Sequence, residues 1–382
     1  MQKNLKYWLG FNLVRGIGPM RLRVLIDHFG GIEAAWHAPE AALRELRLDR
    51  RATRNLLKVR HQVDLDTVIE RMTRVGAHAL TWDSPDYPAA LALLDDAPPV
   101  LYVRGTLTPA DEWAVGIVGT RKVSVYGREV THRMALGLAQ HGVTVVSGLA
   151  RGADGIAHKA ALEAGGRTIA VLGSGLDNIY PAEHRKLADA IAEQGAVVSD
   201  YPMGTRPEAS NFPPRNRIIS GLSLGVIVTE AGLRSGALIT ADFAADQGRE
   251  VFAVPGSILS PGSAGCNRLL RDGAHVLTEV RDVLETLNLD QLAEKQQARM
   301  ILPENATEAT ILDELSAEPH HLDDLSRQAG LPVATVSSTL VMMELKGMVR
   351  QVSPLHYVRV REAGEVYEVA PKNSTKIENE GG

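Results

Sequence analysis

Short, almost continuously apolar runs recur through the middle of the chain, and each is followed by a stretch long enough for a helix. The runs lie at 114–118, 143–146, 168–172, 196–198, 224–228 and 250–254. A strand buried on both faces has this unbroken apolar character, and strands that alternate with helices form a parallel sheet covered on both sides. The pattern predicts an α/β domain over residues 112–290, built on a doubly wound, mostly parallel sheet.

Residues 1–75 have helical periodicity instead. One predicted face carries Leu5, Trp8, Leu9 and Leu13, and a second carries Leu22, Leu25, Ile26 and Phe29. Gly16-Ile17-Gly18 between them looks like the hairpin of a helix-hairpin-helix unit, whose N–H groups can hold a phosphate. A tight turn in a small helical (SAM-like) bundle explains the same residues equally well, so both interpretations stay open.

The segment over residues 76–111 is rich in proline, with Pro85, Pro88, Pro98, Pro99 and Pro109. We therefore predict an extended, turn-rich connector that leads into the central domain. A linker is expected over 291–305.

Residues 306–361 show three helical runs followed by two short apolar segments, at 349–352 and 356–360, which predicts a winged helix. The third helical run, 333–346, holds a single lysine and no arginine, asparagine or glutamine. Those are the side chains that mainly read bases and contact phosphates. We therefore expect an interaction module rather than a base reader. The acidic, apolar-poor segment 362–382 predicts a disordered tail.

Composition limits the function classes. The 382 residues include 41 Lys and Arg against 46 Asp and Glu, a net charge of −5, so the whole chain is not a basic coat for nucleic acid, although a local basic cleft stays compatible. The lone Cys266 excludes an internal disulfide and fits a reducing compartment. No apolar run approaches the roughly 20 residues of a spanning helix. We expect a cytoplasmic protein without a membrane partner.

Glycine and arginine gather in the loops after the predicted strands, where doubly wound sheets bind ligands. These loops contain Gly119, Thr120, Arg121, Ser147, Gly148, Arg151, Gly152, Phe212, Arg215, Asn216, Arg217, Ser235, Gly236, Gly256 and Asn267. Glycine lets the backbone approach a ligand closely, helix-start N–H groups favour anions, and arginine binds phosphate bidentately. The set predicts a shared site for a polyphosphate or a nucleic-acid backbone.

The same loops lack the signatures of nucleotide-driven enzymes. Neither GxGxxG nor GxxxxGK[ST] occurs, which weakens dinucleotide and P-loop interpretations. Four histidines in the central domain lack metal-ligand spacing, and we expect them at the surface or at helix ends: His132, His141, His158 and His184. We predict that Asp154 caps a helix and that Cys266 is a buried small residue. Glu230 fits either an acid of a hydrolase or a group that holds a neighbouring loop. No cofactor, metal or catalytic residue is expected.

The loops taken together resemble the DNA-processing protein A family (DprA, also called Smf). The matching strings are Gly119-Thr120-Arg121, SGLARGAD at 147–154, FPPRNR at 212–217, SGALITA at 235–241 with Thr240, VPG at 254–256 and GCNRLL at 265–270. Thr120 stands where the family more often has Ser, and Ala153 where it more often has Ile. Both changes keep the neighbouring Gly, Arg and Asp.

The resemblance implies an extended Rossmann-like domain that binds single-stranded DNA without ATP hydrolysis. It also implies protection of incoming strands in natural transformation, loading of a RecA-type recombinase past single-strand-binding protein, and a homodimer. On this hypothesis Arg121, Arg151, Arg215 and Arg217 neutralise phosphates, and Gly119, Gly148, Gly236 and Gly256 cradle them. Phe212 either stacks on a base or fills the core.

An enzyme of the nucleoside-monophosphate phosphoribohydrolase type, on a related sheet, is the alternative. Such enzymes place a glycine-rich loop and a glutamate after a strand, with a motif close to Pro-Gly-Gly-x-Gly-Thr. The corresponding stretch here begins Thr229-Glu230-Ala231-Gly232 and lacks the double glycine. Base release from nucleoside monophosphates distinguishes the two hypotheses.

Overall fold

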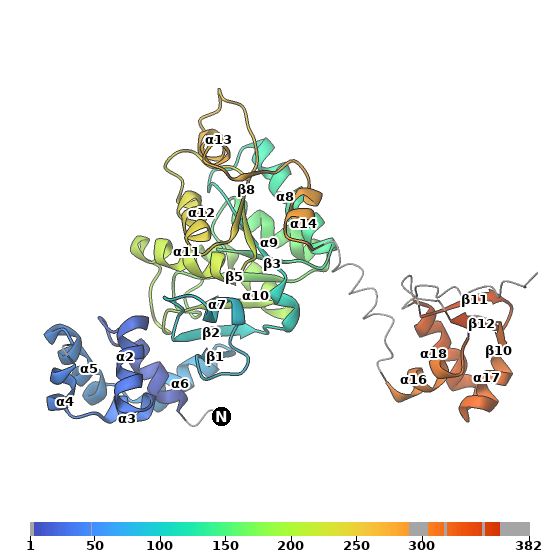
Figure 1. The fold of residues 1–382 in the computed structure, drawn as a ribbon, viewed down its shortest axis with the longest axis horizontal. Coiled ribbons are helices and arrows are strands. Elements are labelled where there is room, and N and C mark those ends of the chain that lie inside the picture. Colours follow the sequence, from blue (N-terminus) through green and yellow to red (C-terminus); the bar gives the residue numbers. More distant parts are fainter. Residues whose placement is uncertain (1–3, 47, 290–304, 317–318, 346–347, 360–382) are drawn as a thin grey trace, which may run out of the picture. The chain divides into compact units, whose positions relative to one another are not determined.

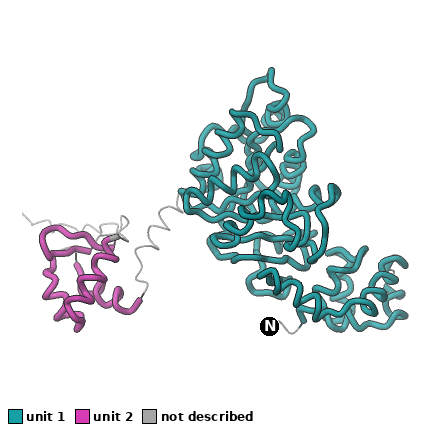
Figure 2. The backbone as a smooth tube through the Cα atoms, turned by 180° about the vertical axis from the view of Figure 1, so that it is seen from behind, with its two compact units in different colours: residues 1–290 teal, residues 291–382 magenta. Residues whose placement is uncertain are grey.

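The fold is taken from a computed structural model that describes residues 4–46, 48–289, 305–316, 319–345 and 348–359. The chain divides into two units, residues 1–290 and residues 291–382 (Figure 2). Among the described helices, none combines the length and the apolar composition needed to cross a membrane.

A nine-stranded sheet forms the centre of the first unit, in the order β1-β2-β6-β5-β4-β3-β7-β8-β9 (Figure 1). Seven strands run parallel: β3 (Ala114–Val118), β4 (Thr144–Ser147), β5 (Thr168–Val171), β6 (Ala196–Ser199), β7 (Gly225–Val228), β8 (Glu250–Ala253) and β9 (His275–Val276). The predicted doubly wound sheet is confirmed. Its strand order reverses at β3, which lies between β4 and β7, and ligands bind at such a switch point.

Helices cover both faces of this sheet because each crossover connection carries one. On one side α8 (Val125–Gln140) packs on α9 (Ala153–Glu163), and α9 packs on α10 (Arg185–Gln194). On the other, α11 (Phe212–Gly221) packs on α12 (Gly236–Asp246). The chain then continues through α13 (Ala264–Arg271) and α14 (Val280–Thr286).

The proline-rich segment 76–111 does more than connect. It supplies two antiparallel strands on one side of the sheet, the edge strand β1 (Ala77–Thr81) and β2 (Val100–Gly105), which pairs with both β1 and β6, together with α7 (Ala89–Ala92) and the 3₁₀ turn η1 (Pro109–Glu112). None of the prolines lies within these strands, since four lie between them and Pro109 begins η1, so they leave the ladder intact. On β2 the Tyr102 hydroxyl donates to Asn12 Oδ1 at 3.0 Å, and Asn12 Nδ2 donates to the Asp200 carbonyl at 3.2 Å. These bonds join the N-terminal helices to the sheet.

The predicted helical N-terminus is confirmed, and it comprises six helices among the described residues: α1 (Leu5–Asn12), α2 (Pro19–Phe29), α3 (Ile32–His37), α4 (Glu40–Glu45), α5 (Arg50–Gln62) and α6 (Leu65–Arg74). Their core is fully buried at Leu9, Leu25, Leu43 and Leu56. Each such side chain contributes roughly 1.5–3 kcal/mol by leaving water.

The second unit is the predicted winged helix. Helices α16 (Ala306–Asp313), α17 (Leu322–Ala329) and α18 (Val333–Leu345) lie with strands β10 (His320–His321), β11 (Val349–Ser353) and β12 (His356–Arg359), in the sheet order β10-β12-β11. The short β10 extends the expected two-stranded ribbon. Of the predicted linker over 291–305 only Asn305 is described, and the predicted disordered tail over 362–382 lies outside the described residues.

Candidate nucleic-acid interface

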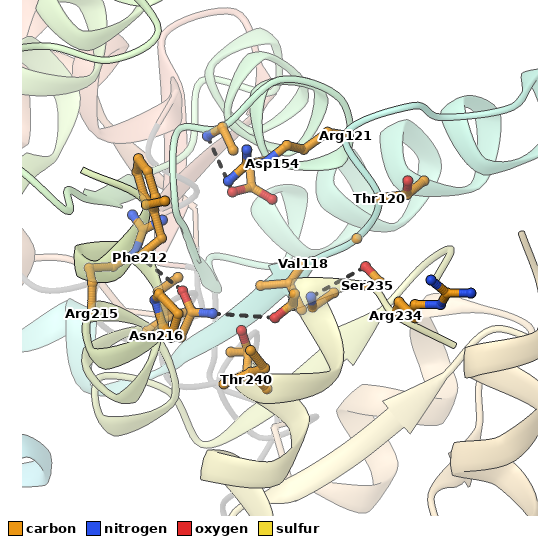
Figure 3. Close-up of a pocket in the computed structure, with 18 of the residues that line it drawn as sticks. Val118, Thr120, Arg121, Asp154, Phe212, Arg215, Asn216, Arg234, Ser235 and Thr240 are labelled. Atoms are coloured by element: carbon orange, nitrogen blue, oxygen red, sulfur yellow. Dashed lines mark hydrogen bonds between the residues drawn. The ribbon is translucent and has the colours of Figure 1, made fainter. Parts of the chain in front are cut away.

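A pocket of about 660 Å³ opens at the carboxyl end of the sheet, at the switch point. The turns after β3 and β7 and the first turn of α11 surround it, and they bring Arg121, Arg234 and Arg215 to its walls (Figure 3). Of the residues predicted from the loops, the lining includes Gly119, Thr120, Arg121, Phe212, Arg215, Asn216, Ser235, Gly236 and Thr240.

Close backbone contacts fix the turn after β3. Thr120 N donates to the Glu230 carbonyl at 2.7 Å, and Ala153 N donates to the Thr120 carbonyl at 3.2 Å. A Cβ on Gly119 would lie 2.7 Å from Ala153 Cβ. Gly152 has a φ of +79°, and a Cβ there would strike the Thr120 carbonyl. Glycine at both positions therefore holds the turn close, and the Arg121 side chain stays exposed beside the pocket.

A buried cation stands at the pocket wall. The Arg215 guanidinium is only 4% exposed and donates through Nη1 to the Gly148 carbonyl at 2.8 Å. Burial lowers the pKa of Arg215 to about 10, so it stays charged at neutral pH. Burial raises the pKa of the neighbouring Asp154, while the Arg215 charge acts to lower it. A Cβ on Gly148 would lie 2.6 Å from Arg215 Nη2 and 2.7 Å from Asp154 Oδ2, which explains the glycine between them.

The Phe212 ring lies among charged and aromatic groups at the pocket. The guanidinium carbons of Arg121 and Arg215 are 5.3 Å and 5.9 Å from its centroid, and the Tyr180 ring centroid is 5.8 Å away. Phe212 is half-buried and lines the pocket, so it is not a core residue. Tyr180, which is 39% exposed, belongs to the same wall.

The N-terminus of α12 completes the site. Ser235 caps this helix by accepting from Ala237 N at 3.3 Å, and Asn216 Nδ2 donates to the Gly236 carbonyl at 3.4 Å. Arg234 is exposed next to the cap. Across the described parts of the chain, neither Arg121 nor Arg234 forms an ion pair with a carboxylate. Free guanidinium groups beside helix-start N–H groups attract anions.

Comparison with known proteins agrees with this geometry. The family model described as DNA recombination-mediator protein A matches residues 78–288, and the DprA winged helix domain matches residues 294–353. The chain belongs to the DNA recombination-mediator protein A family. Protein Smf of Synechocystis is 36% identical over 390 residues, covering 92% of this chain and 98% of the relative.

Two solved structures of the family are similar to this chain. The X-ray structure of DNA processing protein A from Streptococcus pneumoniae aligns with a TM-score of 0.64 at 34% identity, over 73% of this chain and 95% of that one. DNA processing protein A from Helicobacter pylori aligns with a TM-score of 0.50 at 33% identity, over 56% of this chain and 97% of that one. The Helicobacter pylori structure concerns the single-stranded DNA binding mode of that protein.

Two predicted arginines of this family member lie outside the pocket lining, each paired with carboxylates. Arg151 is exposed and binds Glu183 in a bidentate pair, at 2.5 Å and 3.0 Å. Arg217 is largely buried and binds Asp200 at 2.8 Å and Asp96 at 3.4 Å. Both guanidinium groups thus already have anionic partners within the chain.

Other predicted residues hold the backbone around the pocket rather than line it. The buried Ser147 hydroxyl donates to the Ile117 carbonyl at 2.6 Å. Asn267 clamps the loop after β8: its Oδ1 accepts from Gly256 N at 3.2 Å, and its Nδ2 donates to the Gly256 carbonyl at 3.0 Å. Gly148 and Gly152 likewise allow close packing behind the pocket.

Among the lining residues that the sequence did not predict for the site, Arg234 and Tyr180 bear most directly on DNA binding. Arg234 had a signal, because it is the basic residue in the glycine-containing loop between β7 and α12. Tyr180 had none, since it lies in the long connection after β5, where no spacing places its ring against Phe212.

The remaining candidates have structural contacts. Glu230 is 6% exposed, and its Oε2 accepts from Ser124 N at 2.9 Å, so it holds the start of α8. Cys266 is buried, as predicted. The expectation that His158 lies at the surface or a helix end is wrong. Its ring is fully buried between α9 and the sheet, with Nδ1 2.7 Å from Thr168 Oγ1.

Proposed function

We propose that this chain binds single-stranded DNA in the pocket at the sheet's switch point. The observation that carries the proposal is the exposed, carboxylate-free guanidinium group of Arg121 beside the aromatic Phe212, with a second such group, that of Arg234, in the same pocket lining. Proteins hold single strands without reading sequence by two kinds of contact: cations neutralise the phosphate backbone, and aromatic rings stack on the bases. The buried Arg215 adds fixed positive charge behind the ring.

Within its family, we propose that the chain acts as a recombination mediator in the cytoplasm during natural transformation. It would protect incoming strands and load a RecA-type recombinase onto them, past single-strand-binding protein and without hydrolysing ATP. A homodimer would be the working form. Family membership and the DNA-processing names of its relatives support this part of the proposal.

The enzyme alternative has less support from the site. A hydrolytic glutamate must face the substrate, but the Glu230 carboxylate accepts from Ser124 N and is flanked by Gly127 and Gly262, where added Cβ atoms would contact it. Glu230 is also absent from the pocket lining. Incubation with nucleoside monophosphates tests the alternative. Base release that Glu230→Gln abolishes would favour the enzyme.

Fluorescence anisotropy with a labelled oligothymidine tests the proposal. We expect Arg121→Ala and Arg234→Ala each to weaken binding about tenfold, since a hydrogen bond to a charged group contributes about 1.5–3 kcal/mol. Arg133→Ala is the matched control, because Arg133 is exposed on α8 outside the pocket and also lacks an ion pair within the described residues. Equal affinity in the two pocket variants and the control would exclude the pocket as the binding site.

A further inference from the structure

The turn between α1 and α2 exposes its backbone, and its residues do not belong to the single-strand pocket. Ile17 is buried and anchors the turn, while Gly16 adopts a φ of +95° and Gly18 has open space where a Cβ would stand. A cavity of about 480 Å³ is lined by residues 16–21. Gly18 is the N-cap of α2 and Pro19, which has no N–H, is its first residue, so the helix-start N–H groups without an intrahelical partner belong to the residues that follow Pro19.

Four exposed arginines from two parts of the fold surround the hairpin: Arg15, Arg21, Arg51 and Arg54. Arg21 Nη1 donates to the Gly16 carbonyl at 2.6 Å. On α5, Asn55 Nδ2 donates to the Arg15 carbonyl at 2.8 Å, and Ala52 Cβ would lie 3.4 Å from a Cβ on Gly16. The start of α5, with Arg51 and Arg54, is therefore held against the turn. We call these four arginines and residues 16–18 the hairpin patch.

The arginines of the hairpin patch have no carboxylate partner among the described residues. Within the described ranges, none of the four guanidinium groups forms an ion pair, whereas Arg44 in the same helical region binds Glu40. Asp49 caps α5 by accepting from Arg51 N at 3.0 Å, so it faces the helix start. Like charges gathered on one surface repel one another, and a bound polyanion removes that repulsion.

The hairpin patch differs from the pocket in one property that decides its ligand. The tyrosine, tryptophan and phenylalanine rings of α1 and α3 are buried, namely Tyr7, Trp8, Phe11 and Trp36, so they offer no platform for an unstacked base. What the patch presents is cations and backbone N–H groups. Such groups contact phosphates and fix position without reading sequence, and duplex DNA carries the denser row of phosphates.

We propose that the hairpin patch binds the phosphate backbone of duplex DNA, as a second nucleic-acid site independent of the single-strand pocket. This goes beyond the proposed function, because the two sites together would let one chain hold a duplex and a single strand at once. The patch contacts phosphates through Arg51, Arg54 and the open N–H groups of the hairpin. The pocket accepts a strand whose bases are free to stack.

Charge reversal in the full chain tests the proposal, with a mixed-sequence duplex and an oligothymidine as probes. The variant is Arg51→Glu/Arg54→Glu. The control is Arg71→Glu/Arg74→Glu, which changes the net charge equally on α6, where both arginines are exposed. Glutamate near a helix start is favoured by the helix dipole, so the variant should fold. Thermal unfolding checks this, and Arg51→Gln/Arg54→Gln gives a second variant without new negative charge.

We expect the Arg51→Glu/Arg54→Glu variant to lose at least about tenfold in duplex affinity and about two units of salt slope, since each phosphate contact contributes about 0.9. Oligothymidine affinity and the control should change less than about twofold. A wild-type chain that does not bind duplex, or equal losses in variant and control, would overturn the proposal. If Arg121→Ala left oligothymidine binding intact while the reversal abolished duplex binding, the pocket function would fail and the hairpin patch would stand.

Discussion

At the scale of single residues, the arginines divide according to the partner that each one meets. Arg151 and Arg217 are matched by carboxylates, whereas Arg121 and Arg234 are not. The sequence predicts all four in loops near the carboxyl edge of the sheet, whereas Arg217 lies in α11. The sequence also does not reveal which acidic side chain a fold brings within reach. The glycine and arginine pattern could therefore predict the location of the site, although not which cations stay free there.

Replacing Phe212 tests how much base stacking, as distinct from charge, contributes to single-strand affinity. We expect Phe212→Leu, which keeps an apolar side chain, to lower single-strand affinity about tenfold, because base stacking on an aromatic ring contributes about 1–3 kcal/mol. Phe212→Tyr, the matched control, should bind like wild type. Anisotropy titrations of both variants measure the difference. Full binding by Phe212→Leu would show that the ring only packs against Gly173 and its neighbours.

The buried His158 predicts an acid sensitivity. Thr168 Oγ1 donates its proton to the Val145 carbonyl, so it accepts from His158 Nδ1–H, and burial lowers the pKa of the imidazole to about 3. The unfolded chain, with an ordinary histidine pKa near 6.5, takes up this proton first as the pH falls. His158 therefore adds stability above about pH 6.5 that is lost toward pH 3.

Denaturant unfolding at two pH values measures this effect. Between about pH 7 and about pH 5 the His158 contribution to the free energy of unfolding should fall by about 2 kcal/mol. The variant His158→Asn should be less stable at neutral pH but should lack this part of the pH dependence. Identical pH dependence in the two proteins would mean that His158 has the same pKa in the folded and the unfolded chain.

At the scale of elements, the strands most easily predicted are those buried on both faces. The strands β3 to β8 are short and almost wholly apolar, so their pattern alone predicts them. The strand β2 is buried and paired on both sides, but it directly follows Pro98-Pro99, which mark a turn. The edge strand β1 precedes the proline-rich stretch, and the edge strand β9 has two residues, both exposed. Edge strands need only half the burial and half the pairing of central ones. Local sequence therefore predicts edge strands weakly. It predicts the glycine-rich turns that precede the helices around the pocket more strongly.

The start of α12 provides a test in which stability and binding separate. Ser235→Ala removes the cap and should lower the free energy of unfolding by about 1 kcal/mol. Ser235→Asp keeps a capping oxygen and should unfold like wild type, yet its negative charge at the pocket should weaken single-strand binding. Chemical denaturation and anisotropy on both variants measure this. If Ser235→Asp bound DNA as well as wild type, the α12 start would not face the phosphates.

At the scale of the whole molecule, the winged helix forms a unit with its own core, which includes Ile311, Leu325, Val336 and Leu340. Its α18 exposes Val333, Val341 and Met342 and carries no arginine, which suits packing on another protein better than reading bases. We expect a chain that ends at Asn305 to keep most of its single-strand affinity. If this chain were well folded but did not bind, the winged helix would be a nucleic-acid reader.

The salt dependence of single-strand binding measures directly whether Arg121 and Arg234 neutralise phosphates of a bound strand. Oligothymidine affinity is measured across a range of salt concentrations for wild type and for Arg121→Ala/Arg234→Ala. Each neutralised phosphate of a single strand contributes about 0.7 to the slope of log affinity against log salt. If single strands bind at Arg121 and Arg234, we expect a clear negative slope for wild type and a slope shallower by about 1.4 for the double variant. A wild-type slope near zero, or equal slopes in the two proteins, would contradict binding at these residues.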